Sequence, residues 1–524
     1  MSEATPAASG APAPSKFRAS AVVVLVRGRG ARLEVYWVRR SDVVPAMPGF
    51  HAFIGGGVNA EDSSLAAAMT PPAGDDAAAA ADGFDTAQLR VLEACVIREA
   101  FEETGVLLGT GASTEAAALA AMRDQVLEGT TSFGAFAREH GWGFEGGALR
   151  YIGRWTTPPF SAARFDSAFF LAEVPQGQEP TIIPGELASG EWIAPDVALA
   201  QWKAGDAAFA APILNVLLEL ASAASAAGDA FAVPVLERLR SAPRRAGQPV
   251  RRIEMKWGIV LHPVKTSPLP PATHTNTYLV GDRDMALIDP GSAEPAELDA
   301  LYSVIEALAA DGRRVACVIA THHHPDHTAG IEAVRERFHV PVFAHTESAR
   351  AVRPDRTLDD GEIITLASNA RDWSLRTIHT PGHTRGHLSF LHPGTRSLFT
   401  GDHIPGGHGS VIIDPPDGDM NEYLESLERL LHEPIETLFP GHGSPQGGAL
   451  RRIRAMIAHR LERETKVLAA LDGTPRPLGE LVARAYADTP RELWSYAERS
   501  LLAHLLKLER EDRAARDGDR WQSA

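Results

Sequence analysis

The sequence predicts a multidomain α/β protein that ends in a small helical module. With 524 residues, the chain is too long for one hydrophobic core and long enough for roughly two to four domains. Apolar runs typical of strands alternate with helical patterns, which is the order found in α/β layers. In the second half, several of these strands end at polar residues beside glycine, where α/β proteins place their ligands.

The composition is that of an ordinary soluble globular protein, with 44% hydrophobic and 23% charged residues. No apolar run is long enough to cross a membrane, so we expect no membrane partner. The net charge of −16 argues against a protein that coats nucleic acid, although it does not exclude a local basic groove. Cys95 and Cys317 lie in apolar-periodic segments, which predicts buried reduced thiols and a cytoplasmic location.

Changes in composition along the chain suggest where the domains begin and end. The first residues are Ala, Pro, Ser and Gly, and Ser241–Pro249 has the composition of a linker. We expect a disordered tail at 1–16, a first domain at 17–240 with an insertion at about 59–86, a linker at 241–251, a second domain at 252–465 and a C-terminal module at 466–524.

The first domain should contain a β-hairpin, a long helix and a later strand. The β-branched runs Ser20–Arg27 and Leu33–Arg40 predict the hairpin. A helix is expected from about residue 87 to 104, where Gly105 ends it. Arg164–Ala172 reads as a strand. The insertion shows weak periodicity and is expected to hold one short helix.

Three glutamates crowd one face of the long helix. At 100° per residue, Glu99, Glu102 and Glu103 fall within an arc of about 100°. Carboxylates this close repel one another unless a cation lies among them. A solvated acidic face is the simpler interpretation, but it leaves Arg98 before the cluster and Gly105 after it unexplained.

The segment Arg98–Val106 resembles the core of the Nudix box, Arg-Glu-x-x-Glu-Glu-x-Gly followed by an apolar residue. The resemblance implies a Nudix α/β/α domain whose three glutamates hold magnesium or manganese on a diphosphate, while Arg98 fixes their geometry. The family's earlier glutamate, eight residues before the arginine, falls at Arg90 here, and its opening glycine falls at Phe84.

Other residues of this half are similar to the coenzyme A diphosphatase-like branch of Nudix enzymes. They are the insertion, Arg39, Arg40, the Met47–Gly49 turn, and Glu186 ahead of Trp192–Pro195. The resemblance implies that the two arginines and the turn meet the substrate. It makes Glu186 a candidate base or additional metal ligand.

The second domain is organised around the stretch Thr321–Gly330, which contains a dense cluster of metal-binding side chains. His322, His324, Asp326 and His327 lie within six residues, a density that core packing does not require. Imidazole and carboxylate donors together suit a divalent metal, zinc first. Downstream, three further strands run into polar residues beside glycine: His383, Asp402 and His442.

This order of donors resembles the metallo-β-lactamase superfamily, whose fold is an αββα sandwich. Carried over position by position, the resemblance assigns one metal ion to His322, His324 and His383, a second to Asp326, His327 and His442, and a bridging role to Asp402. Asp289 matches an aspartate that orients a ligand from behind. His387 and His403 are either substrate contacts or hydrogen-bonded loop histidines.

The C-terminal residues should form a small helical module. Ala449–Ala470 is an arginine-rich helix, and Leu478–Tyr486 and Leu493–Leu508 are further helices. The layout resembles the winged-helix tail of the endoribonuclease-like branch of the superfamily. A cap on the metal domain or a dimer face is an equally good interpretation. The arginines are either a solvated face or contacts for an anionic substrate.

The residues indicate a hydrolase, because two zinc or similar ions would activate water for attack on a carbonyl or phosphorus centre. Ester, thioester and phosphodiester substrates, including single-stranded RNA, stay open for the second domain, and coenzyme A or nucleotide derivatives for the first. The expected catalytic residues are Asp326, Arg98, Glu102, Glu103 and Glu186.

Two alternatives remain, and the sequence leaves the oligomeric state open. The first-domain half could be a degenerate sensing or scaffold domain, as the residue at Arg90 suggests. The whole could instead be an RNA-binding module with a structural metal, although structural zinc normally lacks an open coordination position.

Overall fold

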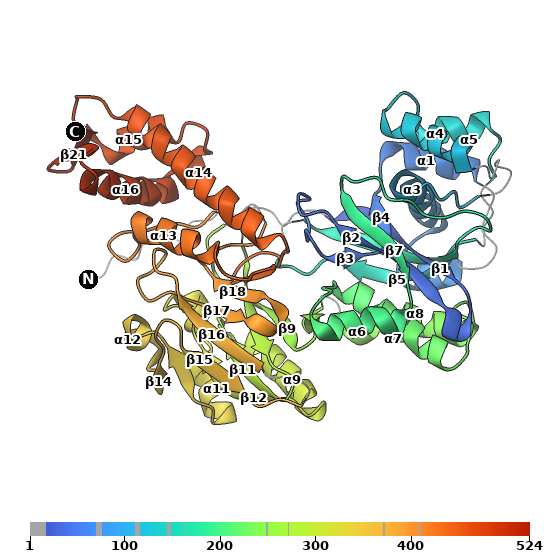
Figure 1. The fold of residues 1–524 in the computed structure, drawn as a ribbon, viewed down its shortest axis with the longest axis horizontal. Helices are drawn as coiled ribbons and strands as arrows, with labels where there is room; N and C mark the ends of the chain where they lie inside the picture. The colour runs from blue at the N-terminus through green and yellow to red at the C-terminus, as the bar shows by residue number, and fades with distance from the viewer. Residues whose placement is uncertain are drawn as a thin grey trace.

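The computed structural model describes residues 17–69, 76–109, 116–143, 148–161, 163–247, 250–270, 272–369, 373–407 and 410–524. They form two α/β domains and a C-terminal helical module, drawn in blue to green, yellow to orange and red in Figure 1. The multidomain α/β prediction is therefore confirmed. The predicted tail at 1–16 lies outside the described residues.

The first domain is built on a sheet in the order β3-β2-β1-β6-β5, with β4 added to β1 and β7 to β2. Its strands are β1 (Arg18–Arg27), β2 (Glu34–Arg40), β3 (His51–Ala52), β4 (Ile54–Gly57), β5 (Arg150–Thr156), β6 (Phe165–Glu173) and β7 (Leu187–Ile193). The predicted hairpin is present, with the short 3-10 turn η1 (Gly30–Arg32) between β1 and β2. The central strand β1 runs parallel to β6.

Helices cover both faces of this sheet. Successive side chains of β1 point to opposite faces, so each face carries apolar residues that must be buried. Val23 and Leu25 pack with the long helix α3, whereas Val24 and Val26 pack with α7. Asp85 begins α3 through a capping box, and Gly105 ends it with a left-handed backbone. The helices are α1 (Ala60–Ala68), α2 (Asp76–Ala81), α3 (Thr86–Thr104), α4 (Ala116–Leu127), α5 (Phe133–Glu139), α6 (Pro195–Ala204), α7 (Ala211–Ser225) and α8 (Val233–Ala246).

Two expectations for this half are corrected. The described residues of the range 59–86 include two helices, α1 and α2, where one short helix was expected. The predicted linker at 241–251 begins inside α8, and residues 248–249 lie outside the described residues. Helix α8 belongs to the first domain because Leu239 and Ala242 are buried, and Nε of Arg240 donates to the Tyr151 carbonyl at 2.8 Å.

The second domain contains two sheets, ordered β14-β13-β12-β11-β10-β9-β8 and β15-β16-β17-β18-β19. The first comprises β8 (Ile253–Lys256), β9 (Ile259–Lys265), β10 (His274–Val280), β11 (Asp284–Ile288), β12 (Arg314–Ile319), β13 (Val342–Ala344) and β14 (Arg356–Thr357). The second comprises β15 (Ile363–Leu366), β16 (Trp373–His379), β17 (Leu388–His392), β18 (Ser397–Gly401) and β19 (Thr437–Pro440). Tyr278 packs against Phe399 and Phe439 with ring centres 5.2 and 5.7 Å away, which joins the two sheets.

Helices flank these sheets, so the layers follow the predicted sandwich (Figure 1). They are α9 (Pro295–Ala310), α10 (Pro325–Thr328), α11 (Ile331–Phe338), α12 (Ala349–Val352) and α13 (Met420–Leu430), with the short turns η2 (Thr346–Ser348) and η3 (Pro393–Thr395). The apolar faces of α9 and α11 pack on one sheet, and that of α13 packs on the other.

The C-terminal module combines three helices with a small antiparallel sheet, as in a winged helix. It consists of α14 (Ala449–Ala470), β20 (Arg476–Pro477), α15 (Leu478–Ala485), η4 (Arg491–Leu493), α16 (Trp494–Arg510), β21 (Ala514–Asp517) and β22 (Arg520–Ser523). The boundary expected at 465/466 falls inside α14, which packs with the second domain through Ile453 and with the module through Val467. Trp521 on β22 is buried and packs with the helices in the apolar core of the module.

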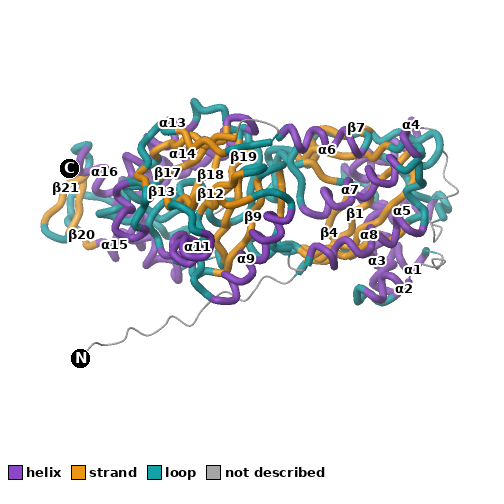
Figure 2. The backbone as a smooth tube through the Cα atoms, turned by 90° about the horizontal axis from the view of Figure 1, so that it is seen from below, coloured by secondary structure: helices purple, strands orange, loops and turns teal. Residues whose placement is uncertain are grey.

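The two large domains share one apolar core. Trp37 and Phe209 of the first domain belong to the same buried cluster as Met255 and Leu261 of the second. A backbone hydrogen bond also joins them, because the N–H of Phe209 donates to the Met255 carbonyl at 2.9 Å. Figure 2 shows the two domains side by side, with the C-terminal module at the far side of the second domain.

Both cysteines are buried free thiols, as expected. Among the described residues, no helix is both long and apolar enough to cross a membrane.

Candidate metal centre

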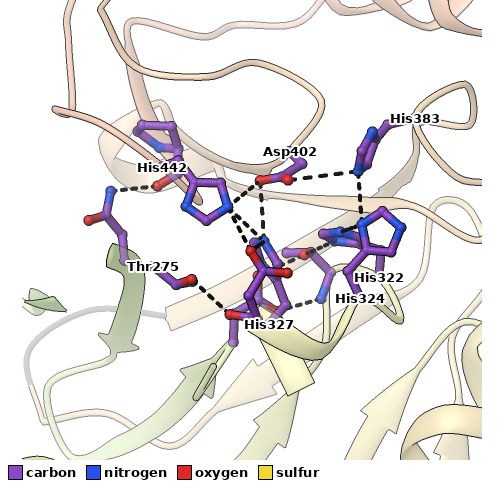
Figure 3. Close-up of polar contacts among 12 residues, drawn as sticks. Thr275, His322, His324, His327, His383, Asp402 and His442 are labelled. Carbon is purple, nitrogen blue, oxygen red and sulfur yellow. Dashed lines mark hydrogen bonds and ion pairs between the residues drawn. The ribbon is translucent and has the colours of Figure 1, made fainter. Parts of the chain in front are cut away.

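The seven predicted donors of the second domain all follow the carboxyl ends of strands. They are His322 and His324 after β12, Asp326 and His327 on α10, His383 after β16, Asp402 after β18 and His442 after β19. Three of these strands belong to the second sheet and one to the first, so the donors meet at the edge where both sheets end. Figure 3 shows the side chains of His322, His324, His327, His383, Asp402 and His442 converging.

The first group consists of His322, His324, His383 and Asp402. Nε2 of His322 lies 2.9 Å from Nδ1 of His324, and that nitrogen lies 3.1 Å from Nε2 of His383. Oδ2 of Asp402 lies 3.7 Å from Nε2 of His383. Four donor atoms therefore surround one small volume (Figure 3).

The second group consists of Asp326, His327 and His442. Nε2 of His442 lies 3.2 Å from Nε2 of His327 and 3.3 Å from Oδ2 of Asp326. Oδ1 of Asp402 lies 3.3 Å from both of these Nε2 atoms. Asp402 thus places one carboxylate oxygen at each group, which is the arrangement a bridging ligand requires.

The hydrogen bonds behind the rings show that these donors suit a cation. Nδ1 of His383 donates to the Ile412 carbonyl and Nδ1 of His442 to the His274 carbonyl, each at 2.9 Å. When neutral, Nε2 of His442 then carries a lone pair that faces the lone pair on Nε2 of His327 at 3.2 Å, because Nδ1 of His327 donates to Asp289. A divalent ion bound by imidazole and carboxylate removes that conflict.

The charges of the centre also favour a positive ion. Burial lowers the pKa of His324 to about 4, so this ring stays neutral and able to bind metal. Burial also lowers the pKa of His442, but the Asp402 and Asp326 carboxylates together outweigh it and raise the pKa of His442 to about 9. The centre therefore attracts positive charge, which a metal ion can supply.

Asp289 lies behind the second group, where the sequence places it. Its Oδ2 accepts from Nδ1 of His327 at 2.8 Å and from Oγ1 of Thr321 at 2.7 Å. Its Oδ1 accepts from the Thr321 backbone N–H at 2.8 Å. These bonds fix the His327 ring and the start of the donor segment together.

The glutamates of the first domain surround a buried arginine. Nη1 of Arg98 contacts Glu99 at 2.9 Å and Glu102 at 2.8 Å. Its other side makes a bidentate pair with Asp62, at 2.8 and 3.1 Å. Glu103 accepts from the backbone N–H of Gly55 at 3.0 Å.

Burial raises the pKa of all three glutamates, to about 7 for Glu99 and about 8 for Glu103. After burial, the charges of Glu99 and Glu186 also raise the pKa of Glu103. Glu186 is exposed, and its role as base or ligand stays a prediction. The three glutamates converge less tightly than the histidines do. Within the described part of the chain, the sets of three donors lying within 4.8 Å of one another are in the second domain.

Comparisons with known proteins match both domains and the C-terminal module. Family models match residues 270–442 (metallo-beta-lactamase superfamily), 478–521 (beta-lactamase associated winged helix domain) and 75–220 (NUDT19 Nudix domain). The "Beta-lactamase-like protein 2 homolog" of Drosophila melanogaster is 32% identical over 253 residues, which are 45% of this chain and 82% of that protein. The chain belongs to the metallo-beta-lactamase superfamily. It is a metallo-beta-lactamase-fold hydrolase fused to a Nudix domain.

Further similar proteins include a thioesterase and two solved structures. The "Atrochrysone carboxyl ACP thioesterase" of Aspergillus chevalieri is 30% identical over 202 residues, 38% of this chain and 60% of that protein. A metallo-beta-lactamase family protein from Thermus thermophilus has 26% identity and a TM-score of 0.43, covering 51% of this chain and 99% of its own. A NUDIX hydrolase from Alicyclobacillus acidocaldarius has 28% identity and a TM-score of 0.35, and the match covers 40% of this chain and 94% of that protein.

The earlier carboxylate of the Nudix domain is not at the position the sequence suggested. Arg90 falls where the family has its glutamate, but the carboxylate that pairs with Arg98 from outside α3 is Asp62 on α1. Asp62 follows Gly56 by the same six residues that separate Phe84 from Arg90. The insertion therefore lies inside the Nudix box, between Asp62 and Arg98, and spacing counted back from the arginine alone could not find it.

The arginines expected to meet the Nudix substrate support a loop instead of standing free. Nη2 of Arg39 contacts Asp42 at 3.2 Å, and Nε of Arg40 donates to the Ala46 carbonyl at 2.9 Å. Their role toward substrate stays a prediction.

Of the two histidines left open, neither joins a donor group of the metallo-beta-lactamase domain. His387 is buried behind Asp402, and its Nε2 accepts from the Asp402 backbone N–H at 3.2 Å. His403 is also buried, against the ring of Tyr423. Asp417, which the sequence did not single out, lies 3.6 Å from His323 at the exposed side of the centre.

Proposed function

We propose that the metallo-beta-lactamase domain is a two-metal hydrolase of thioesters and that the Nudix domain hydrolyses a diphosphate. The observation that carries the first part is Asp402, whose two oxygens face the two donor groups. His322, His324 and His383 would hold one zinc or similar ion, and Asp326, His327 and His442 the other. When bound, such a pair lowers the pKa of water and polarises the scissile carbonyl.

The chain's own residues would prepare this chemistry. Asp289 holds His327, and the carbonyls of Ile412 and His274 hold His383 and His442, so the rings need little rearrangement on binding metal. Asp326 lies at the more exposed side of the second group, where it can contact both a metal ion and an incoming water.

A thioester is favoured over RNA by two observations. Thioesterases are among the similar proteins. In addition, the arginines considered for RNA are partly used within the fold, since Arg460 is buried and donates to the Val411 carbonyl. Arg463 pairs with Asp488 at 2.8 Å. Arg451 and Arg454 remain exposed, so RNA is the second candidate.

For the Nudix domain we propose a diphosphate of the coenzyme A type, with magnesium or manganese on Glu99, Glu102 and Glu103. Their raised pKa values indicate carboxylates that a cation would stabilise in the ionised form. Coenzyme A thioesters contain both a thioester and a diphosphate, so one class of substrate would serve both domains. A sensing or scaffold role for this domain is the alternative. Its basis was the arginine at position 90 where the family has a glutamate, and the pairing of Asp62 with Arg98 weakens that basis.

The test is a panel of substrates on the full chain with zinc and magnesium: acyl-coenzyme A, free coenzyme A, nucleotide sugars and single-stranded RNA. Asp402→Asn should abolish thioester cleavage and leave diphosphate cleavage intact. Glu102→Gln and Glu103→Gln should do the reverse, so each variant is the control for the other. The parent could instead cleave RNA and no thioester, and Asp402→Asn could abolish that cleavage. This result would replace the thioester proposal with RNA as the substrate.

A further inference from the structure

The segment 410–419, which we call the metal-site loop, lies between β18 and α13 and contacts the metal centre. The carbonyl of Ile412 accepts the hydrogen bond from Nδ1 of His383 at 2.9 Å. Farther along, the backbone N–H of Asp419 donates to the carbonyl of Gly382 at 2.9 Å, directly before that histidine. The position of His383 therefore depends on the position of this loop.

The winged-helix module holds the same loop by three arginines. Arg460 of α14 donates to the Val411 carbonyl, Nη1 of Arg499 on α16 lies 3.0 Å from Oδ2 of Asp414, and Nη2 of Arg510 on α16 lies 2.7 Å from Oδ2 of Asp419. Arg460 is buried and stacks over Tyr423, whereas the other two arginines are about half exposed.

Apolar packing adds to this hold. Val411 and Ile413, the neighbours of Ile412 on both sides, are buried in one cluster with Ile453 of α14 and Ala503 of α16. A carbonyl between two anchored residues has little freedom to move. The module thus determines where the Ile412 carbonyl lies.

We propose that the winged-helix module is a positioning element for the first metal ion, acting through the metal-site loop on His383. Losing the acceptor behind a metal-binding imidazole typically weakens metal binding by about 10–100-fold. The second group has its own supports in the second domain, Asp289 and the His274 carbonyl, so the effect is confined to one ion. This inference rests on the proposed two-metal centre.

The test changes the two exposed arginines of the full chain, Arg499→Gln with Arg510→Gln, and measures zinc retained against a competing chelator. The parent should retain two ions per chain, and the double variant should hold one of them about tenfold more weakly. The matched control is Arg484→Gln with Arg516→Gln, which removes two exposed contacts of the same module, to Asp472 and Glu509. The control should retain both ions.

A second readout assigns the ion that is lost. In a His383→Ala background, the two arginine changes should weaken metal binding no further, because they act through that ring. Replacing the arginines by lysine should restore part of the affinity. A parent that binds no metal would refute the proposed function itself. The parent could instead bind two ions while the Arg499→Gln, Arg510→Gln variant keeps both, loses both equally, or behaves like the control. Any of these results would overturn only the positioning role.

Discussion

At the scale of single residues, the pair of Asp62 and Arg98 is the feature on which the Nudix site depends. Asp62 is fully buried and Arg98 nearly so. Asp62→Ala removes the bidentate partner of Nε and Nη2 of Arg98, while Nη1 keeps Glu99 and Glu102. We therefore expect Asp62→Ala to lower the free energy of unfolding by about 1–3 kcal/mol, measured by urea denaturation, and to abolish diphosphate cleavage.

Arg90→Glu provides the control for this prediction. It restores the glutamate that spacing alone assigns to the Nudix box, and it should leave diphosphate cleavage unchanged because Asp62 already pairs with Arg98. A gain of activity in Arg90→Glu, together with full stability in Asp62→Ala, would contradict the assignment.

The same residues show how far the sequence alone reaches. The metal donors are predictable because they lie beside one another or directly after strands, and short spacing limits where their side chains can point. Asp62 and Arg98 are separated by an insertion, and Asp417 approaches His323 only through the course of a loop. Contacts that depend on long-range packing have no local pattern to reveal them.

At the scale of elements, the sequence located long periodic segments well. The helix expected at 87–104 is α3, Thr86–Thr104. Its cap residues and its apolar stripe indicate the same helix ends, so the sequence was sufficient here. The linker expected at Ser241–Pro249 was partly wrong for a related reason. Proline and arginine suggested a linker, yet the apolar period continues through Leu236, Leu239 and Ala242 and keeps α8 on the sheet.

Helix α14 is tied to α16 through Glu464, which makes the winged-helix module sensitive to acid. Burial disfavours the charged form, but adjacent His504 and Lys507 outweigh it and lower the pKa of Glu464 to about 2. Nζ of Lys507 lies 2.8 Å from Oε2. Because the pKa is lower in the folded chain, this stabilisation is complete above about pH 4.5 and disappears as pH falls toward 2.

Glu464→Gln should therefore cost about 2 kcal/mol of stability at pH 7, which allows for screening of its partly exposed partners by water. The difference from the parent should shrink below pH 4.5. Urea unfolding followed at pH 7, 4 and 3 measures it. Glu462→Gln is the control, since that side chain is mostly exposed on the same helix. A difference that stays constant with pH would show that Glu464 acts through packing and not through its charge.

At the scale of the whole molecule, the two hydrolase domains share one buried apolar cluster at their junction. The shared apolar cluster means that separating the chain near residue 250 would expose Phe209 and Met255 to water. Activity is therefore best assigned with point variants of the full chain. The junction also lies near both sites, because the 41–50 loop of the Nudix domain meets the turn that follows His442.

This contact gives a test of whether the junction supports the metal centre. The N–H of Gly447 donates to the Pro48 carbonyl at 2.8 Å. A Cβ at Gly447 would lie 2.8 Å from that oxygen and 3.1 Å from Cα of Gly49, both backbone atoms that cannot turn aside. Gly447→Val should therefore push the loop away at a cost of about 1–3 kcal/mol. It should also lower thioester cleavage, because the displaced turn begins at His442.

Calorimetry and activity measured on the same preparation decide the outcome. Gly473→Val is the matched control, because a Cβ there meets open space. The parent and the control should unfold in a single transition for the two hydrolase domains, whereas Gly447→Val should show an earlier one. If Gly447→Val unfolds like the control and cleaves thioesters as fast as the parent, the loop contact contributes nothing to the metal centre, and the domains are joined by their apolar core alone.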